Sequence, residues 1–194
     1  MWHPDSVSLR GASIAGLTGL ALILATGCGG DGGGGSVPSA KAAKQELAGA
    51  PAPLAAIHKQ ANDLLPGGSR AFTTRLTALK GHGVVVNKWA SWCAPCRYEF
   101  PVMQRVSVKQ GKQIAFLGID ARDSTGGAKR YLTKHPVSYP SYVDPKEQLS
   151  RTAKAPEGFP ITNFYDRAGK LVFQHAGPYT SDTLLERDIT KYIG

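Results

Sequence analysis

Runs of apolar residues alternate along the chain with segments of helical spacing, and this alternation predicts the order of the elements. Residues 83–90 (GVVVNKWA) and 113–120 (QIAFLGID) are rich in β-branched and other apolar residues, which is typical of buried strands. Residues 161–177 predict a hairpin, because Asp166 and Gly169 supply a tight turn between two apolar runs. The apolar pattern therefore predicts a sheet with a buried centre.

Helical spacing of apolar residues recurs between and around these strands. It predicts helices over residues 54–65, 94–109, 126–135, 145–153 and 181–193. The last helix would begin at a Ser181 cap, and its inner face would carry Leu184, Leu185, Ile189, Tyr192 and Ile193. This order of elements predicts an α/β fold with a central mixed β-sheet flanked by helices on both faces.

The chain starts with a segment that is typical of export. Arg10 precedes an apolar run over residues 13–26, which is shorter than the roughly 20 residues that a membrane-spanning helix needs. The run ends in ILATGC, which resembles a bacterial lipobox. Residues 1–27 are therefore predicted to be a lipoprotein signal peptide, with Cys28 as the lipidated first residue of the mature chain. An ordinary cleaved signal or a short membrane anchor is the alternative.

Composition divides the rest of the chain into a linker and one domain. Residues 28–53 are rich in glycine, alanine and proline, and they predict a flexible linker after the lipidated cysteine. Residues 54–194 have the composition and the length of a single globular domain. The 23 basic and 14 acidic residues give a net charge of +9, but the basic residues are scattered. Such a distribution indicates a solvated surface and does not favour nucleic acid as a partner.

The chemistry of the domain centres on two cysteines in the string WASWCAPCRYEFP. Cys93 and Cys96 are separated by two residues, and a staple across so short a loop would constrain little of the unfolded chain. Cys93 should lie at the start of a helix, where unpaired N–H groups stabilise a thiolate. Cys96 should face the same side one turn later, and Pro95 would hold the turn rigid. A zinc half-site is the alternative, but zinc needs four ligands and the sequence offers no second cysteine pair.

These motifs resemble a known family. The string WCAPC after a buried strand resembles the thioredoxin superfamily, and VVVNKWASWCAPCRYEFP is similar to its exported TlpA/ResA-like branch. FLGIDARDS, YPSYVD and GFPITNFYDRAGKLV resemble later segments of the same branch, so the likeness covers roughly residues 54–194. The helix over residues 54–65 departs from the pattern, because members often begin with a strand. The resemblance implies a thioredoxin fold.

The resemblance also implies roles for three residues. Cys93 would be the exposed, attacking sulfur, and Cys96 the buried resolving sulfur. Pro160 would follow a cis peptide bond, face the cysteine pair and offer backbone to a substrate strand. The exchange of thiols and disulfides that this set implies needs no cofactor.

Several neighbours of the cysteines are candidates for supporting roles. Glu99 lies one helical turn beyond Cys96 and could carry protons during exchange, although a solvated glutamate is the alternative. Trp92 is expected to pack beside Cys93 and to shield it. Lys88 is expected to be an ordinary surface residue, and Arg97 could favour the thiolate by its charge.

The sequence as a whole predicts a thiol–disulfide oxidoreductase outside the cytoplasm, anchored to the bacterial cell membrane through acylated Cys28. Its partners would be the thiols and disulfides of exported proteins, and a membrane or extracytoplasmic protein that donates or accepts electrons. A protein-disulfide reductase is the favoured direction, and the resemblance includes reductants of cytochrome c maturation. The alternatives are a disulfide donor, a thiol peroxidase of the peroxiredoxin type, and a copper-binding chaperone of related fold.

Overall fold

A computed structural model of the 194-residue chain describes residues 35–155 and 157–194. Cys28 and the predicted signal peptide lie outside these residues. Within the described part, the strands form one six-stranded sheet in the order β1-β4-β3-β2-β5-β6. The strands are β1 (Leu64–Leu65), β2 (Val84–Trp89), β3 (Ala115–Ala121), β4 (Ser141–Asp144), β5 (Ile161–Tyr165) and β6 (Leu171–Ala176).

The sheet is mixed. Strands β1, β4, β3 and β2 run parallel, whereas β5 is antiparallel to β2 and β6 is antiparallel to β5. Every residue of β2, β3 and β5 is buried. A strand that is buried on both faces requires helices on both sides of the sheet, which the apolar runs in the sequence predicted.

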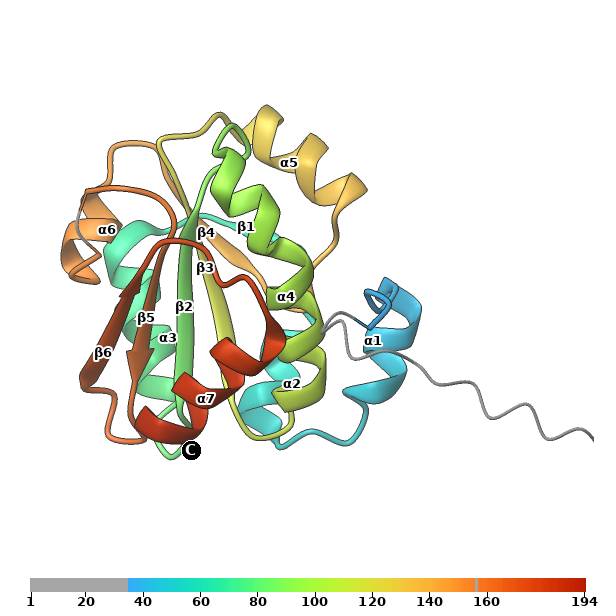
Figure 1. The fold of residues 1–194 in the computed structure, drawn as a ribbon. Coiled ribbons are helices and arrows are strands. Elements are labelled where there is room, and N and C mark those ends of the chain that lie inside the picture. Colours follow the sequence, from blue (N-terminus) through green and yellow to red (C-terminus); the bar gives the residue numbers. More distant parts are fainter. Residues whose placement is uncertain (1–34, 156) are drawn as a thin grey trace, which may run out of the picture. The chain divides into compact units, whose positions relative to one another are not determined.

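Helices cover the two faces of the sheet (Figure 1). Helices α4 and α7 pack together across one face, and α3 lies on the opposite face beside α6. The helices are α1 (Ala40–Glu46), α2 (Ala52–His58), α3 (Gly68–Ala78), α4 (Ala94–Gln110), α5 (Thr125–Lys134), α6 (Gln148–Thr152) and α7 (Asp182–Tyr192). This architecture confirms the predicted α/β fold with a central mixed sheet between helices.

The predicted helix over residues 54–65 is wrong in its second half. Helix α2 ends at His58, and Leu64 and Leu65 instead form a two-residue strand beside β4. The change of direction occurs at Asn62, whose φ of 67° is left-handed and whose N–H donates to the carbonyl of Tyr139 at 3.0 Å. The two leucines fit a helical stripe equally well, so their spacing alone did not identify the strand.

The short helix expected to begin at Pro145 starts three residues later. Helix α6 begins at Gln148, and the preceding Glu147 has a left-handed φ of 54°. The carboxylate of Asp144 accepts hydrogen bonds from the N–H groups of Leu149 at 3.0 Å and Ser150 at 2.7 Å. The buried aspartate at the end of β4 therefore sets the start of α6.

The segment expected to be a flexible linker contains a helix. Ser39 begins α1, because its hydroxyl accepts the N–H of Ala42 at 3.2 Å. Ala43 and Leu47 are buried, and α1 packs against α4. These two apolar positions lie four residues apart and form a narrow stripe, which the alanine-rich composition concealed.

The last helix follows the prediction except on its inner face. The hydroxyl of Ser181 accepts the N–H of Leu184 at 3.3 Å, as a cap should. Leu185 and Ile189 are buried, but Leu184 is exposed and was wrongly assigned to the core. Asp188 takes a buried place on the same helix.

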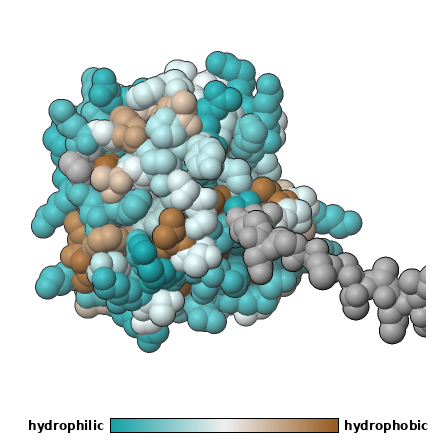
Figure 2. All heavy atoms as spheres, viewed as in Figure 1, coloured by the Kyte–Doolittle hydropathy of each residue, from teal (hydrophilic) through white to brown (hydrophobic). Residues whose placement is uncertain are grey.

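The face of the molecule that is drawn in Figure 2 shows little continuous apolar area. Figure 2 shows one face of the molecule, where hydrophilic residues predominate and apolar ones form separate small groups. Among residues 35–155 and 157–194, no helix combines the length and the apolar character needed to cross a bilayer. The large apolar side chains that are exposed in the described part are Val37, Trp92, Tyr98, Val172 and Leu184. Two of these, Trp92 and Tyr98, flank the cysteine pair.

Candidate active site

The two cysteines lie where β2 gives way to α4. Strand β2 ends at Trp89, and Cys93 is the N-cap residue of α4. Its sulfur accepts the N–H of Cys96 at 3.1 Å, and a disulfide of 2.03 Å joins the two sulfurs. The structure therefore places Cys93 at the start of the helix, where the sequence predicted it, and Pro95 in the first helical turn, where a missing N–H costs nothing.

Both cysteines of the disulfide are buried, though not equally. Cys93 is 3% exposed and Cys96 is 0% exposed, while the intervening Ala94 and Pro95 are exposed. The expectation of an exposed Cys93 is therefore wrong for the disulfide form. Cys93 is still slightly more exposed than Cys96.

Glu99 is a buried acid one turn beyond Cys96. Its side chain is fully buried, so the alternative of a solvated glutamate is wrong. One carboxyl oxygen accepts the amide of Asn87 at 2.7 Å, and the other accepts the N–H of Tyr179 at 3.1 Å. Burial raises the pKa of Glu99 to about 8, and this effect outweighs the two hydrogen bonds, which lower it. The carboxyl therefore holds a proton at neutral pH.

Tyr179 links Glu99 to the last helix. Its hydroxyl donates to the carboxylate of Asp188 at 2.8 Å, and its ring stacks on His175 with the ring centres 4.1 Å apart. Asn87 also donates to the hydroxyl of Thr162 at 3.3 Å on β5. Sequence reasoning missed Tyr179 because it lies 80 positions from Glu99, in a segment without a recognisable motif.

Trp92 directly precedes Cys93 in the sequence and lies on the surface. Its side chain is 55% exposed and packs edge to face on Phe159, with the ring centres 5.2 Å apart. Its indole N–H donates to the carbonyl of Arg122 at 2.9 Å. The peptide bond between Phe159 and Pro160 is cis, as the family resemblance implied, and Pro160 is buried. That Pro160 faces the cysteine pair and binds a substrate strand stays a prediction.

Lys88 contradicts its expected place on the surface. It is 1% exposed, and its ammonium group lies 2.8 Å from the carboxylate of Glu147 and 4.5 Å from the centre of the Phe159 ring. A charge inside the sheet needs such a partner. The signal in the sequence that could have indicated its burial was its position inside the apolar run of β2. Arg97 is exposed over the ring of Tyr131, and its influence on the thiolate stays a prediction.

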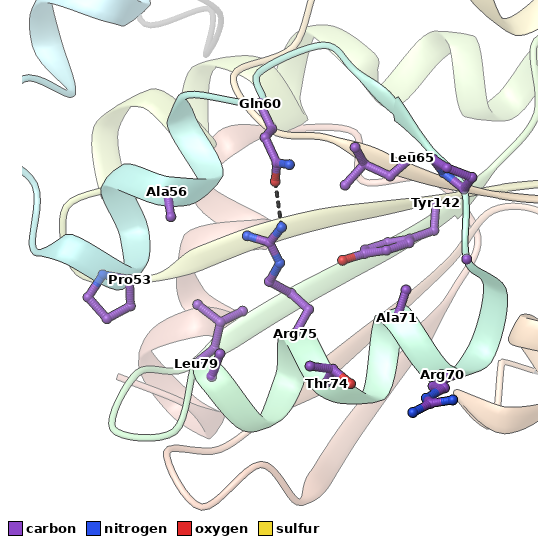
Figure 3. A pocket seen from close by; sticks show the side chains of 13 residues that line it. Pro53, Ala56, Gln60, Leu65, Arg70, Ala71, Thr74, Arg75, Leu79 and Tyr142 are labelled. Carbon is purple, nitrogen blue, oxygen red and sulfur yellow. Dashed lines mark hydrogen bonds between the residues drawn. The ribbon is translucent and has the colours of Figure 1, made fainter.

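The described part of the chain contains no candidate metal site. Across residues 35–155 and 157–194, no group of three or more His, Cys, Asp or Glu residues is placed to hold a metal ion. A hollow of about 630 Å³ lies between α2 and α3, and Figure 3 shows Arg75 reaching across it to Gln60, with a hydrogen bond of 2.5 Å. None of the residues that line this hollow is a cysteine, a histidine or an acid.

Comparison with known proteins identifies what the chain is similar to. A model of the AhpC/TSA family matches residues 57–174. The chain is 32% identical over 138 residues to the thiol:disulfide interchange protein HelX of Rhodobacter capsulatus, a match that covers 71% of this chain and 76% of HelX. It is 29% identical over 110 residues to the thiol-disulfide oxidoreductase ResA of Bacillus thuringiensis, and there it spans 63% of the length of ResA and 56% of its own.

Solved structures give the same answer for the fold. A putative thiol:disulfide interchange protein DsbE from Chlorobium tepidum aligns with a TM-score of 0.54 and 33% sequence identity. The alignment covers 60% of this chain and 83% of that protein. The fold is thioredoxin-like, as the sequence predicted.

Because Glu99 is buried, we expect the free energy of unfolding to depend on pH. The unfolded chain releases this proton near the ordinary pKa of 4.5, whereas the folded chain holds it up to about pH 8. The folded state therefore binds more protons in this window, and the free energy of unfolding falls as pH rises through it. In urea titrations of the oxidised protein, we expect Glu99→Gln to reduce that fall by at least about 2 kcal/mol between pH 5 and pH 8.

The matched control is Glu46→Gln, which changes an exposed glutamate at the end of α1. This control should keep the pH dependence of the unmodified protein. Equal pH dependence in the Glu99→Gln variant would show that Glu99 does not hold its proton in the folded state.

Proposed function

The chain belongs to the AhpC/TSA family. We propose that it is a thiol–disulfide oxidoreductase, which exchanges electrons with the cysteines of other proteins through Cys93 and Cys96. The observation that carries the proposal is the disulfide at the start of α4, one helical turn from a buried acid. The relatives named as thiol-disulfide oxidoreductase and as thiol:disulfide interchange protein support this activity.

Cys93, the less deeply buried of the two cysteines, is the nucleophile that we assign to this reaction. In the reduced protein, the thiolate of Cys93 attacks one sulfur of a substrate disulfide, and the other substrate sulfur leaves as a thiolate that takes a proton. The N–H of Cys96, which points at this sulfur, stabilises the thiolate before the attack. The buried position of Cys96 keeps it from meeting the substrate first.

Cys96 completes the transfer. Its thiol loses a proton and attacks the sulfur of Cys93, so that the mixed disulfide breaks, the Cys93–Cys96 disulfide forms and the second substrate thiolate leaves. Two electrons pass to the substrate in total, and its two thiolates become thiols by taking up the proton of Cys96, which Glu99 relays, and one proton from solvent. Glu99 lies one turn away on the same helix, and we assign its ionised form, which is populated as pH approaches its pKa of about 8, to accept the proton of Cys96.

Reduction of substrate disulfides is the direction that we propose. Cys96 and Glu99 are fully buried, and burial disfavours an anion at either position. A pair whose thiolate form is poorly stabilised gives up its electrons more readily, because a strong oxidant owes its strength to a stabilised reduced form. Only at Cys93 is this effect opposed, because the N–H groups at the start of α4 stabilise a thiolate there.

The first residues of the chain support a proposal for the cellular location of the protein. We place the domain outside the cytoplasm, tethered to the cell membrane by a lipid on Cys28, with exported proteins as its substrates. The export-type segment over residues 1–27 and its ILATGC ending support this location. An electron-transfer protein of the membrane or of the same compartment would restore the reduced pair.

Replacement of either cysteine separates their roles. In an insulin reduction assay, Cys93→Ser should lower the rate by more than about 100-fold, because the nucleophile is lost. Cys96→Ser should also stop turnover, but it should leave Cys93 in mixed disulfides with substrate that a non-reducing gel detects. Normal turnover in Cys93→Ser, or an absence of trapped species in Cys96→Ser, would contradict these roles.

Equilibration with glutathione at pH 7 tests the direction. Alkylation of the free thiols measures the fraction of the pair that is reduced. We expect a reduction potential closer to the value of thioredoxin, about −270 mV, than to the value of strong oxidases, about −120 mV. A potential at the oxidising end would show that the protein is a disulfide donor.

Membrane attachment tests the role of Cys28 separately. When the full chain is expressed in a bacterium that processes lipoproteins, Cys28→Ala should move the domain from the membrane fraction to the soluble exported fraction. The two other cysteines remain intact in this variant, so insulin reduction should be unaffected. Retention in the membrane would point to an uncleaved anchor.

A further inference from the structure

A second buried acid lies near the end of β3, where its partner on β2 is Trp89, four residues before Cys93. Asp120 is 2% exposed, and its neighbours in the sheet are Trp89 on β2 and Val143 on β4. One of its carboxyl oxygens, Oδ1, is buried without a hydrogen-bond partner among the described residues. The carboxyl also hydrogen-bonds to the side chain of Asp123. Two carboxyl groups in direct contact are compatible with one proton between them, but not with two full charges.

Asp123 joins this acid to the turn that precedes Cys93. One of its carboxyl oxygens accepts the N–H of Ser91 at 2.5 Å, and the other accepts the N–H of Ser124 at 2.7 Å. Both oxygens of Asp123 therefore accept from backbone N–H groups, whereas Oδ1 of Asp120 has no such partner, so we assign the shared proton to Asp120. Ser91 is two residues before Cys93, and its N–H has this carboxylate as its partner.

A second bond fastens the same turn to the same loop. The indole N–H of Trp92 donates to the carbonyl of Arg122, next to Asp123. The packing here is close: a side chain added at Gly127 would come within 3.0 Å of the Ser91 hydroxyl and 3.1 Å of the Asp123 carboxylate. The turn over residues 90–92 therefore depends on the loop after β3 for its position.

The charges around Asp120 all favour its protonated form. Asp123 faces it from its own loop and Asp144 faces it from β4. Trp89 adjoins it on β2, and the groups nearest to Asp123 from the turn and from the start of α5 are the neutral Ser91 and Ser124. Burial, followed by these two negative charges, raises the pKa of Asp120 to about 8.

We propose that Asp120 and Asp123 form a proton-sharing pair that positions the turn before Cys93, and that loss of the proton releases this turn. Both are positioning residues and neither touches a substrate. When Asp120 ionises, two adjacent carboxylates repel each other inside the protein. Asp123 is only half-buried, so it can turn towards solvent, and Ser91 then loses its acceptor. The effect on exchange rests on the proposed function, because it acts through Cys93.

The Ser91 amide reports on the pair directly. In ¹H–¹⁵N spectra of the oxidised full chain between pH 5 and pH 10, its shift should follow a single step well above the usual range of a carboxyl group. The cysteines do not titrate in the disulfide form, so they cannot produce that step. Asp120→Asn should abolish it, because an asparagine amide donates to Asp123 at every pH.

Two control variants make this result specific. Glu99→Gln should keep the step at Ser91, since Glu99 bonds to Asn87 and Tyr179 and not to the Asp123 loop. Asp63→Asn, which changes an exposed aspartate, should keep it as well. A flat Ser91 shift in the unmodified protein, or a step that persists in Asp120→Asn, would overturn the proposal.

The pH profile of insulin reduction supplies the functional measurement. We expect the ratio of the rate at pH 9 to the rate at pH 6 to be at least threefold higher in Asp120→Asn than in the unmodified protein, because the variant keeps its turn in place. Equal ratios would overturn the influence on exchange. If no variant reduces insulin at any pH, the proposed function fails, while a Ser91 step that Asp120→Asn removes still supports the positioning role.

Discussion

The hydrogen bond from the N–H of Cys96 to the sulfur of Cys93 is the contact on which the site depends. It exists because a helix begins at Cys93, just after the carboxyl end of the central strand β2 at Trp89. The first N–H groups of a helix have no partner within the helix. A sulfur at that position therefore receives both a hydrogen bond and the positive end of the helix dipole. The same turn of helix places Cys96 within bonding distance.

Two buried acids, Glu99 and Asp120, contact different elements in this part of the fold. Glu99 bonds to β2 and to the segment before α7, whereas Asp120 bonds to the loop after β3. Burial raises the pKa of each to about 8, so both hold protons at neutral pH. A protonated acid adds no negative charge beside a thiolate. While Glu99 is protonated, its position one turn beyond Cys96 therefore does not repel the thiolate that reacts.

Much of the fold was predictable because local patterns carry it. The apolar runs of β2 and β3, the CAPC string and the Ser181 cap depend on neighbours in sequence, and the structure places them as expected. The missed features depend on distant partners. Lys88 is buried because Glu147 lies beside it, and Tyr179 matters because Asp188 and Glu99 hold its two ends. The sequence pattern does not indicate which distant residues will form such pairs. The narrow apolar stripe of α1 is likewise explained only by its packing against α4.

Helix α1 also fixes the point where the chain joins the domain. The carbonyl of Pro38 accepts the side-chain amide of Gln104, which lies 11 residues after Cys93 (104 − 93) on α4. At 1.5 Å per residue, this attachment is about 16 Å from the disulfide along the helix axis. The described segment before α1 therefore meets the domain on the flank of α4, well away from the end of that helix that carries the disulfide.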